Sequence, residues 1–445
     1  MLKKIISILH KYRLLIIGIV LISVANNIHW GKDKFKKIIE SDGKGYYAYL
    51  PAVFIYQDLN FGFFDQMEAT YSNEHLYYDY RQNIDGKFVN KYYCGTAITE
   101  LPFFFIAHLH SWLSDKPLDG YSKYYPIWIN VGAVLYLLLG LFFFGRILTF
   151  FDITNSQTTL LFFAITFGTN AFVYSVLDPG MSHIYSFALI AIFMYYALVL
   201  FQKFTEPPVD PLRYRRLFFG LAFLLGLIVL IRPINGLILL ATPFLAVHFE
   251  RFKRATITLF THPKIILPCL FLFLGVVSLQ FIIYKIQTGH FLIYSYAEEG
   301  FNFRDPHIFD ILFSYKKGLF VYTPLAFAAL FGLYYIFKNN TYQFWSFTLF
   351  FFILTYFLSS WWNWWYGGSF SSRVFLEYLP MLFIPLALLL KNSAQYVLRK
   401  NMLQILIVTL VIICQIQIYQ FRYFIIHYEN MTQEMYWDKF LKIKK

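Results

Sequence analysis

Long apolar runs, separated by short polar segments, recur along nearly the whole chain. Many of these runs approach the roughly 20 residues that an α-helix needs to cross a lipid bilayer. Their apolar residues are continuous and do not alternate with polar ones, which excludes a closed β-barrel. The pattern therefore predicts an all-α polytopic membrane protein that forms a single membrane domain, residues 1–445.

We expect about eleven transmembrane helices from the lengths of these runs. Their expected ranges are 14–27, 126–149, 158–177, 183–201, 217–231, 234–248, 265–287, 319–337, 344–360, 374–390 and 402–420. A long loop, 28–125, follows the first of them, and a later loop occupies 288–318.

The distribution of Lys and Arg predicts which loops face the cytoplasm, because short cytoplasmic loops are enriched in these residues. The basic segment Lys3–Arg13 places the N-terminus inside. If the apolar stretch 96–113 crossed the membrane, the clusters Arg213–Arg216 and Arg251–Arg254 would lie outside. We therefore expect this stretch to lie along, or dip into, the outer surface as a juxtamembrane helix of one long extracytoplasmic loop. The same count places the basic C-terminal tail outside, against the charge rule.

The composition supports a membrane protein and narrows its chemistry. Hydrophobic residues make up 58% of the chain and charged residues only 14%, well below a soluble domain. The formal net charge of +13 comes from cations scattered over the loops, so we expect contacts with membrane lipids and no nucleic-acid partner. The chain has no CxxC, HExxH or P-loop motif, which predicts no protein-built metal site and no direct use of a nucleotide.

In this topology the unusual polar side chains gather on the extracytoplasmic side. They are Asp42, Lys91, Asp178, His183, Arg232, Glu298, Arg304, Lys317, Trp362, Trp365 and Arg373. Each also has an ordinary interpretation, as a helix cap, a solvated loop residue, a cation that reaches the headgroups or part of an aromatic belt. The inner turns carry only common basic residues, and this asymmetry predicts an active cavity on the outer face.

The mixture of residue types indicates a reaction class. Carboxylates can take a proton from a hydroxyl group. Arginine and lysine can hold a phosphate and stabilise the charge that grows on it as it departs. Aromatic rings offer flat faces to a sugar. This combination beside a bilayer fits the transfer of a sugar from a lipid phosphate.

These residues resemble the GT-C superfamily of membrane glycosyltransferases, in the branch that includes protein O-mannosyltransferases and the lipid A aminoarabinose transferase. The similar features are an acid soon after the first span (Asp42), the run Trp365-Tyr-Gly-Gly-Ser followed by Arg373, the segment Lys317–Pro324, and the pair Arg232-Pro. The chain departs from that branch at Gly43, where a second acid often stands, and near Lys91, which lacks an adjoining Pro-Pro pair.

The resemblance implies a GT-C type A-like fold and an inverting glycosyltransferase that uses a polyprenyl-phosphate sugar. Asp42 is then the general base and Asp178 an acid that orients the acceptor. The expected ligands of the donor phosphate are Lys91, Arg232, Arg304, Lys317 and Arg373; those of the sugar or acceptor are Tyr46, Tyr47, His183, Glu298, Trp362 and Trp365. No cofactor is required by this set, although the acids and the phosphate offer oxygen ligands to a divalent cation.

We expect the protein in the plasma (inner) membrane, with its active site outside the cytoplasm and with a glycan, a lipid or a protein as acceptor. Two alternatives remain open from the sequence. A transporter or flippase of lipid-linked glycans would place charged groups within its spans. A glycan polymerase or ligase would share the same chemistry.

Overall fold

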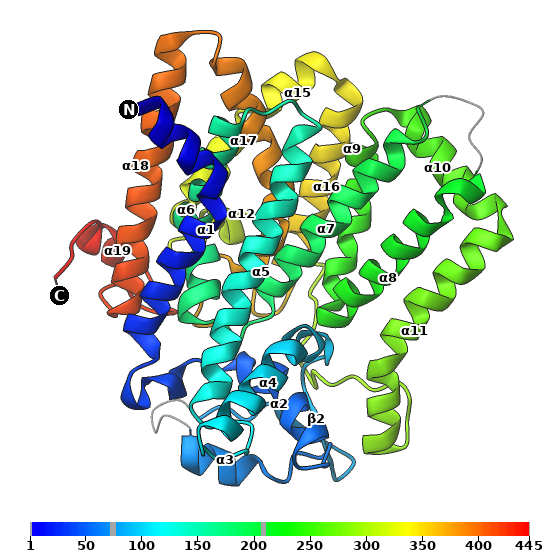
Figure 1. Ribbon diagram of the computed structural model, residues 1–445, viewed down its shortest axis with the longest axis vertical. Helices are drawn as coiled ribbons and strands as arrows, with labels where there is room; N and C mark the ends of the chain where they lie inside the picture. Colours follow the sequence, from blue (N-terminus) through cyan, green and yellow to red (C-terminus); the bar gives the residue numbers. More distant parts are fainter. Residues whose placement is uncertain (1, 72–76, 206–210, 445) are drawn as a thin grey trace.

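A computed structural model describes residues 2–71, 77–205 and 211–444 of the chain. The described residues are mostly helical and contain a single two-stranded antiparallel sheet. Most helices run side by side in one bundle, and a smaller group of elements gathers at one end of it (Figure 1).

Eight helical stretches in the described part of the chain are long and apolar enough to cross a membrane. They contain α1 (Leu2–His29), α5 (Tyr124–Thr149), α7 (His183–Gln202), α8 (Arg215–Ile231), α11 (Pro263–Thr288), α16 (Thr341–Ser359), η5 (Arg373–Tyr378) with α17 (Leu379–Ser393), and α18 (Val397–Arg422). These helices confirm that the chain is an all-α membrane protein.

Three of the eleven expected spans are divided into shorter helices. They form α6 (Asn155–Gly168) with η2 (Val173–Leu177), η4 (Pro233–Ala241) with α9 (Thr242–Ala246), and α13 (Leu319–Tyr322) with α14 (Pro324–Leu330) and α15 (Leu333–Asn339). Proline lacks the amide hydrogen that continues a helix and disfavours helical backbone before it. Pro243 and Pro324 lie at two of these divisions, and Gly168 and Gly332 lie at two others.

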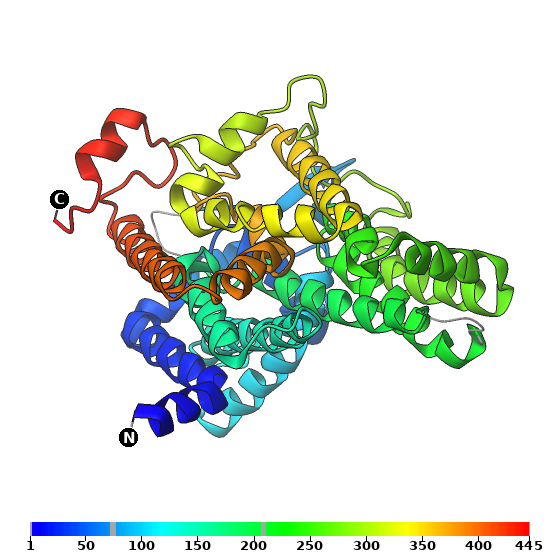
Figure 2. The ribbon, with the colours of Figure 1, turned by 90° about the horizontal axis from the view of Figure 1, so that it is seen from above.

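Contacts between turns define one end of the bundle. Arg13 contacts Asn155 at the start of α6, and Lys391 contacts Asp152. The helix α10 (Phe249–Thr261) lies at the same end and packs against α7, α9 and α11. The short η3 (Pro211–Tyr214) precedes α8 there. In Figure 2, α8, α10 and α11 project together to one side of the bundle.

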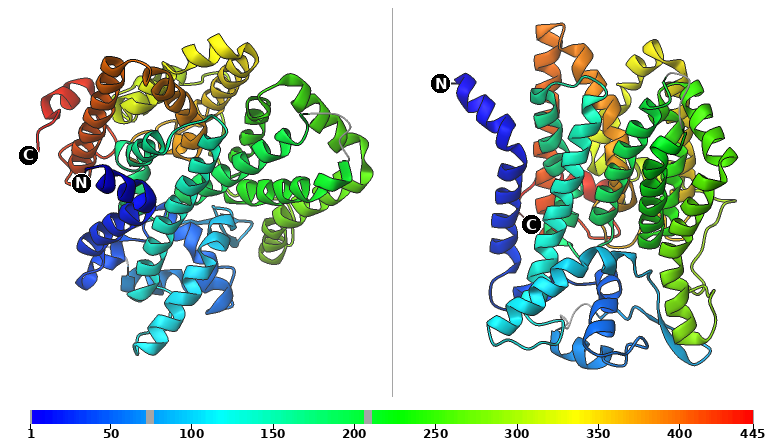
Figure 3. Two further views of the ribbon diagram at one scale, coloured as in Figure 1. Left: turned by 45° about the horizontal axis from the view of Figure 1, so that its top comes forward. Right: turned by 45° about the vertical axis from the view of Figure 1, so that its right-hand side comes forward.

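The segment between α1 and α5 forms the opposite end. It contains η1 (Lys32–Lys37), α2 (Asp42–Phe54), α3 (Phe64–Tyr71), the strands β1 (Arg81–Ile84) and β2 (Lys87–Asn90), and α4 (Gly95–Leu113). Figure 3 shows these elements grouped across the end of the bundle. They have a hydrophobic core of their own, rich in Tyr and Phe, while the spans share a second and larger core.

The later loop begins at this same end, where Glu299 pairs with Lys91, and the segment after α18 contacts Trp365. The loop contains α12 (Ile308–Phe313), and the chain after α18 ends with α19 (Gln433–Lys439). The indole nitrogen of Trp365 donates to Glu429, 2.9 Å away. The side chain of Gln420, near the end of α18, donates to the carbonyls of Lys439 and Lys442, so the basic tail folds back beside α18.

Candidate active site

Asp42 begins α2 and lies between two polar partners from distant parts of the chain. Its Oδ2 is 2.6 Å from Nη2 of Arg373, and its Oδ1 accepts a hydrogen bond from the Tyr92 hydroxyl at 2.8 Å. A carboxylate in the first turn also complements the positive end of the helix dipole. The side chains of Asp42 and Arg373 are only 19% and 17% exposed, so this ion pair is largely shielded from water.

The environment of Asp42 favours its ionised form. Burial alone raises the pKa of a carboxyl group. At Asp42 the positive charge of Arg373 and the Tyr92 hydrogen bond outweigh burial, and its pKa lies below the ordinary value. Asp42 is therefore a carboxylate at neutral pH.

Two glycines bring the Asp42 helix against the turn that carries Asp178. A Cβ added at Gly43 would lie 3.3 Å from the backbone carbonyl atoms of Gly180, closer than side chains normally pack. A side chain at Gly43 would therefore press on the Gly180 backbone, which would have to shift by a few tenths of an ångström. The close approach places the Asp178 turn beside the start of α2.

Asp178 differs from Asp42 in its protonation behaviour. Burial raises the pKa of Asp178 to about 6, and the charge of Arg373 opposes this only in part. Two carboxyl groups near one guanidinium group thus have pKa values shifted in opposite directions. Such a separation is common where two acids have different roles in one site.

A second charged cluster lies beside the first. The Oε1 atom of Glu377 is 2.9 Å from both His183 Nδ1 and Arg232 Nη1, and Arg232 Nη1 is 3.1 Å from the same His183 nitrogen. Glu377 is fully buried. Nearby, Tyr378 donates to the side chain of Asn235 at 3.3 Å.

Aromatic rings lie beside Asp42. The rings of Tyr46 and Tyr92 are 4.5 Å apart, and Tyr296 lies 6.2 Å from Tyr92 and 5.6 Å from Trp361. The hydroxyls of Tyr78 and Tyr92 are hydrogen-bonded to each other. This arrangement offers several ring faces and hydroxyl groups to a polar ligand.

Lys91 connects the first loop to the later loop. Its Nζ is 2.6 Å from Oε1 of Glu299 and 5.5 Å from the centre of the Tyr296 ring. The Lys91 carbonyl also accepts a hydrogen bond from Ser295 at 2.8 Å. Lys91 thus holds the loop after α11 against the hairpin of β1 and β2.

Other predicted site residues have different surroundings. Tyr47 packs in the first-loop core and donates to the Gly120 carbonyl. The Lys317 amine donates to the Ser369 and Tyr428 carbonyls, and burial lowers the pKa of Lys317 to about 7. The Trp365 ring lies 3.3 Å from Lys316 Nζ. Within the described residues, Lys317 and Trp365 fasten the C-terminal segment to the bundle.

Three further predicted residues are exposed. Glu298, Arg304 and Trp362 lie in or beside the later loop, and Trp362 is 50% exposed. In the part of the chain that the structure describes, no hydrogen bond or ion pair joins them to Asp42 or Arg373. The residues that the structure brings together are Asp42, Arg373, Tyr46, Asp178, His183 and Arg232.

The sequence interpretation did not include Glu377, Tyr92 and Ser372. Glu377 is a lone acid within the run expected to span at 374–390, and an acid inside a span often has a functional partner. The sequence therefore contained a signal that Glu377 belongs to the candidate site. Ser372 precedes Arg373, and its buried hydroxyl has no hydrogen-bond partner among the described residues. The Nε of Arg373 is also buried without a partner there.

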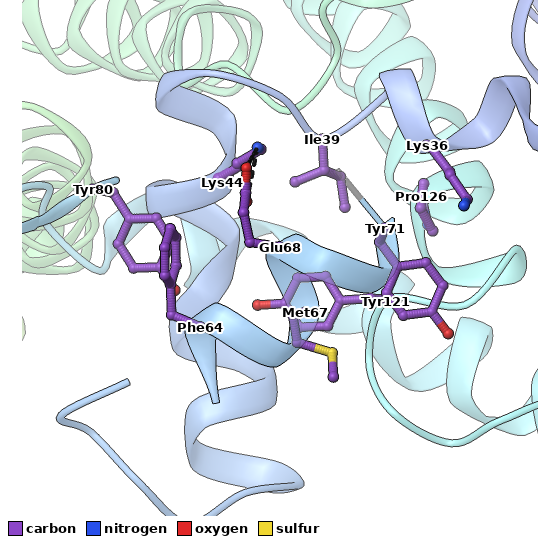
Figure 4. Close-up of a pocket in the computed structure, with 10 residues that line it drawn as sticks. All are labelled: Lys36, Ile39, Lys44, Phe64, Met67, Glu68, Tyr71, Tyr80, Tyr121 and Pro126. Carbon is purple, nitrogen blue, oxygen red and sulfur yellow. Dashed lines mark hydrogen bonds and ion pairs between the residues drawn. The ribbon is translucent and has the colours of Figure 1, made fainter. Parts of the chain in front are cut away.

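A small cavity lies on the other side of α2. Figure 4 shows Lys44 and Glu68 paired in its wall, with Lys44 Nζ 2.8 Å from Glu68 Oε1, among the rings of Phe64, Tyr80 and Tyr121. Residues two apart on a helix point in nearly opposite directions, so Lys44 faces away from Asp42. The cavity measures about 40 Å³, room for a few water molecules and not for a sugar.

Among the described residues, no group of three or more His, Cys, Asp or Glu side chains is placed to hold a metal ion. No protein-family model matches the sequence, and no curated protein is significantly similar to it.

Proposed function

We propose that this protein is an inverting glycosyltransferase that moves a sugar from a polyprenyl-phosphate donor to an acceptor hydroxyl at the extracytoplasmic face of the membrane. The observation that carries the proposal is the Asp42–Arg373 pair, a shielded carboxylate and guanidinium at the end of a membrane bundle. Transfer from a lipid phosphate needs a base for the acceptor hydroxyl and a cation for the phosphate, and this pair supplies both in one place.

Binding of the donor would release the base. The donor phosphodiester carries one negative charge and competes for the Arg373 guanidinium group, because arginine binds phosphate with charge-assisted hydrogen bonds. Asp42, no longer paired with Arg373, then accepts the proton of the acceptor hydroxyl. The acceptor oxygen forms a bond to the anomeric carbon, and the bond from that carbon to the phosphate oxygen breaks with its electron pair on the phosphate. Attack opposite the phosphate inverts the anomeric configuration.

The contacts rank the candidate phosphate ligands. Arg373 and Arg232 lie in the charged clusters of the site, and Ser372 with Arg373 Nε offers two buried donors without partners among the described residues. A buried donor without a partner costs about 1–3 kcal/mol, which a ligand oxygen would relieve. We assign the phosphate to these groups and the sugar to Tyr46 and the neighbouring rings. A divalent cation shared with the phosphate would use Asp42 and Asp178.

The proposed topology has eleven crossings, three of them made by the divided helices. The contact of Arg13 with Asn155 lies at one end of α6, and the Asp178 turn after η2 lies at the other. The positive-inside rule then puts the α10 end in the cytoplasm and the site outside the plasma (inner) membrane.

One observation favours a second candidate, a transporter or flippase of lipid-linked glycans. Glu377 and His183 lie within helical stretches long enough to span the membrane, where charged groups often mark a substrate path. A transporter would move the intact lipid-linked sugar, whereas a transferase would cleave it. A polymerase or ligase would instead require a preassembled glycan as its donor.

The test is turnover of a panel of radiolabelled polyprenyl-phosphate sugars by the purified protein in proteoliposomes. The proposal expects label to leave the carrier lipid for a glycan, lipid or protein acceptor. Movement of intact donor between leaflets without cleavage would contradict it and favour the transporter. Cleavage with retained anomeric configuration would contradict the inverting mechanism.

A further inference from the structure

The helix α10 has three chemically different flanks. Its 13 residues are Phe-Glu-Arg-Phe-Lys-Arg-Ala-Thr-Ile-Thr-Leu-Phe-Thr. Residues in an α-helix follow one another at about 100°. This spacing places Phe252, Ala255 and Leu259 on one flank, and Ala255 is buried while the ring of Phe252 lies 6.3 Å from Phe201 of α7. This flank faces the bundle.

The second flank of α10 is apolar but exposed. Phe249 and Phe260 are 11 residues apart and fall within about 20° of each other on the helix. They are 54% and 68% exposed, and Ile257 beside them is 50% exposed. Exposed aromatic rings on one flank of a short helix are unusual on a surface that faces only water.

The third flank is cationic. Arg251 and Arg254 lie on the side of α10 away from Phe249 and Phe260, and Lys253 lies beside the exposed rings. Arg213, Arg215 and Arg216 are exposed nearby, since Phe204 at the end of α7 contacts both Tyr214 and Phe218. Within the described residues, none of these six cations lies in a salt bridge.

The depth of α10 is fixed by its neighbour. α10 ends at Thr261, and the spanning helix α11 begins at Pro263. Figure 1 shows α10 at the end of the bundle, next to the start of α11. An amphipathic helix attached there lies at the boundary between hydrocarbon and headgroups, where its apolar flank can enter the acyl region while its cations stay at the surface.

We propose that α10, with the Arg213–Arg216 segment, is a binding surface for anionic phospholipid headgroups at the end of the bundle opposite the candidate site. A lipid surface is favoured over a protein partner because α10 adjoins a helix long enough to span the membrane, and because the six cations outnumber the one acid of α10, Glu250. Attraction to an anionic surface contributes about 1 kcal/mol for each Lys or Arg near it, equivalent to roughly five-fold in affinity. This inference does not depend on the proposed glycosyltransferase activity.

The first test measures binding of a fluorescent anionic phospholipid to the full-length protein in zwitterionic mixed micelles. The combined variant Arg251→Gln, Lys253→Gln, Arg254→Gln should weaken binding by at least about ten-fold. The matched control, Lys338→Gln, Arg399→Gln, Lys400→Gln, removes three exposed cations elsewhere and should change it less than about three-fold. Equal binding by the α10 variant and the wild type would overturn the proposal, as would an equal loss in the control.

A second test does not need the charge variants to fold. An environment-sensitive fluorophore is attached at Phe260→Cys, and in a second protein at Arg254→Cys; the three native cysteines are buried. In vesicles that contain anionic phospholipid, the probe at 260 should show a blue-shifted emission and the probe at 254 should not. Water-like emission at 260 in those vesicles, or binding of a soluble protein partner that displaces lipid from α10, would overturn the proposal.

Discussion

The two ends of the helical bundle carry their positive charges in different ways. At the first-loop end, Arg373 and Arg232 are mostly buried and lie 2.6 and 2.9 Å from carboxylates. At the α10 end, Arg215, Arg216 and Lys253 are exposed. Exposed cations fix orientation and contact lipid, which needs no defined partner. Buried ion pairs require defined geometry, and they mark the end where chemistry is expected.

The two ends also differ in the free energy that their charged groups cost. Bringing a charge out of water costs several kcal/mol, and a buried pair recovers this only when its geometry is good. The first-loop end contains two such clusters within contact distance of aromatic rings. Apolar residues of similar size would give the bundle equal or greater stability than these buried ion pairs.

The largest effect on stability is expected at Glu377. Replacement by alanine leaves Arg232 buried without its carboxylate partner, which should lower the free energy of unfolding by about 3–5 kcal/mol. Denaturant unfolding in detergent micelles measures this. The control Glu434→Ala removes an exposed acid of α19 and should have little effect. Similar stability of the two variants would show that the buried cluster at this end is not energetically different from surface charge.

The next effect is expected at the contact between α2 and the Asp178 turn. Gly43→Asp adds a side chain against the Gly180 backbone and should destabilise the protein by about 1–3 kcal/mol, the usual cost of overpacking. Gly275→Ala is the control, because nothing lies within 4 Å of its added Cβ. Both unfolding free energies are compared with the wild type, and a neutral Gly43→Asp would contradict the close approach.

The two acids should give opposite pH dependences. The pKa of Asp178 is raised to about 6 by burial, so its contribution to stability is present below the unfolded value near 4 and is lost as pH rises through about 6. The pKa of Asp42 is lowered by Arg373 and Tyr92 against the effect of burial, so its contribution is lost as pH falls. Unfolding free energy between about pH 2 and 7 measures both, with the Asp178 change above pH 4 and the Asp42 change below it. In Asp178→Asn the loss near pH 6 should disappear; its persistence would assign that titration to another group.

The smallest effect is expected at Lys91 and Glu299, whose side chains are 13% and 27% exposed. Partly solvated ion pairs contribute about 0.2–1 kcal/mol. A double-mutant cycle of Lys91→Gln and Glu299→Gln should give a coupling energy in this range. A coupling energy above about 3 kcal/mol would mean that this pair behaves like a buried ion pair. The distinction between buried and partly solvated ion pairs at this end would then be wrong.

Much of the fold follows from the sequence because long apolar runs have one stable form in a bilayer. The helices α5, α7 and α11 lie within a few residues of their expected ranges. The divided helices differ from their expected spans because Pro324 and Gly168 interrupt them. The apolar composition of these runs predicts uninterrupted helices. Periodicity reports where apolar residues lie, while these interruptions depend on local backbone chemistry.

The site was less accessible to sequence reasoning. Asp42 and Arg373 are 331 residues apart, and residue type alone marked them as candidates without indicating their contact. Lys317 was predicted as a phosphate ligand on the same grounds. Its amine instead donates to backbone carbonyls, one of them in the C-terminal segment. No local pattern reports that this segment folds back. The role of each candidate in catalysis stays a prediction.

The most direct measurement is donor cleavage by the Asp42→Asn variant beside the wild type, with the polyprenyl-phosphate sugar that the wild type uses. Loss of a general base should lower turnover by at least about 100-fold, with folding retained by the unfolding assay. The control Asp65→Asn alters an acid of the same loop whose side chain is 77% exposed and should keep activity near the wild-type level. Full turnover by Asp42→Asn would contradict the account.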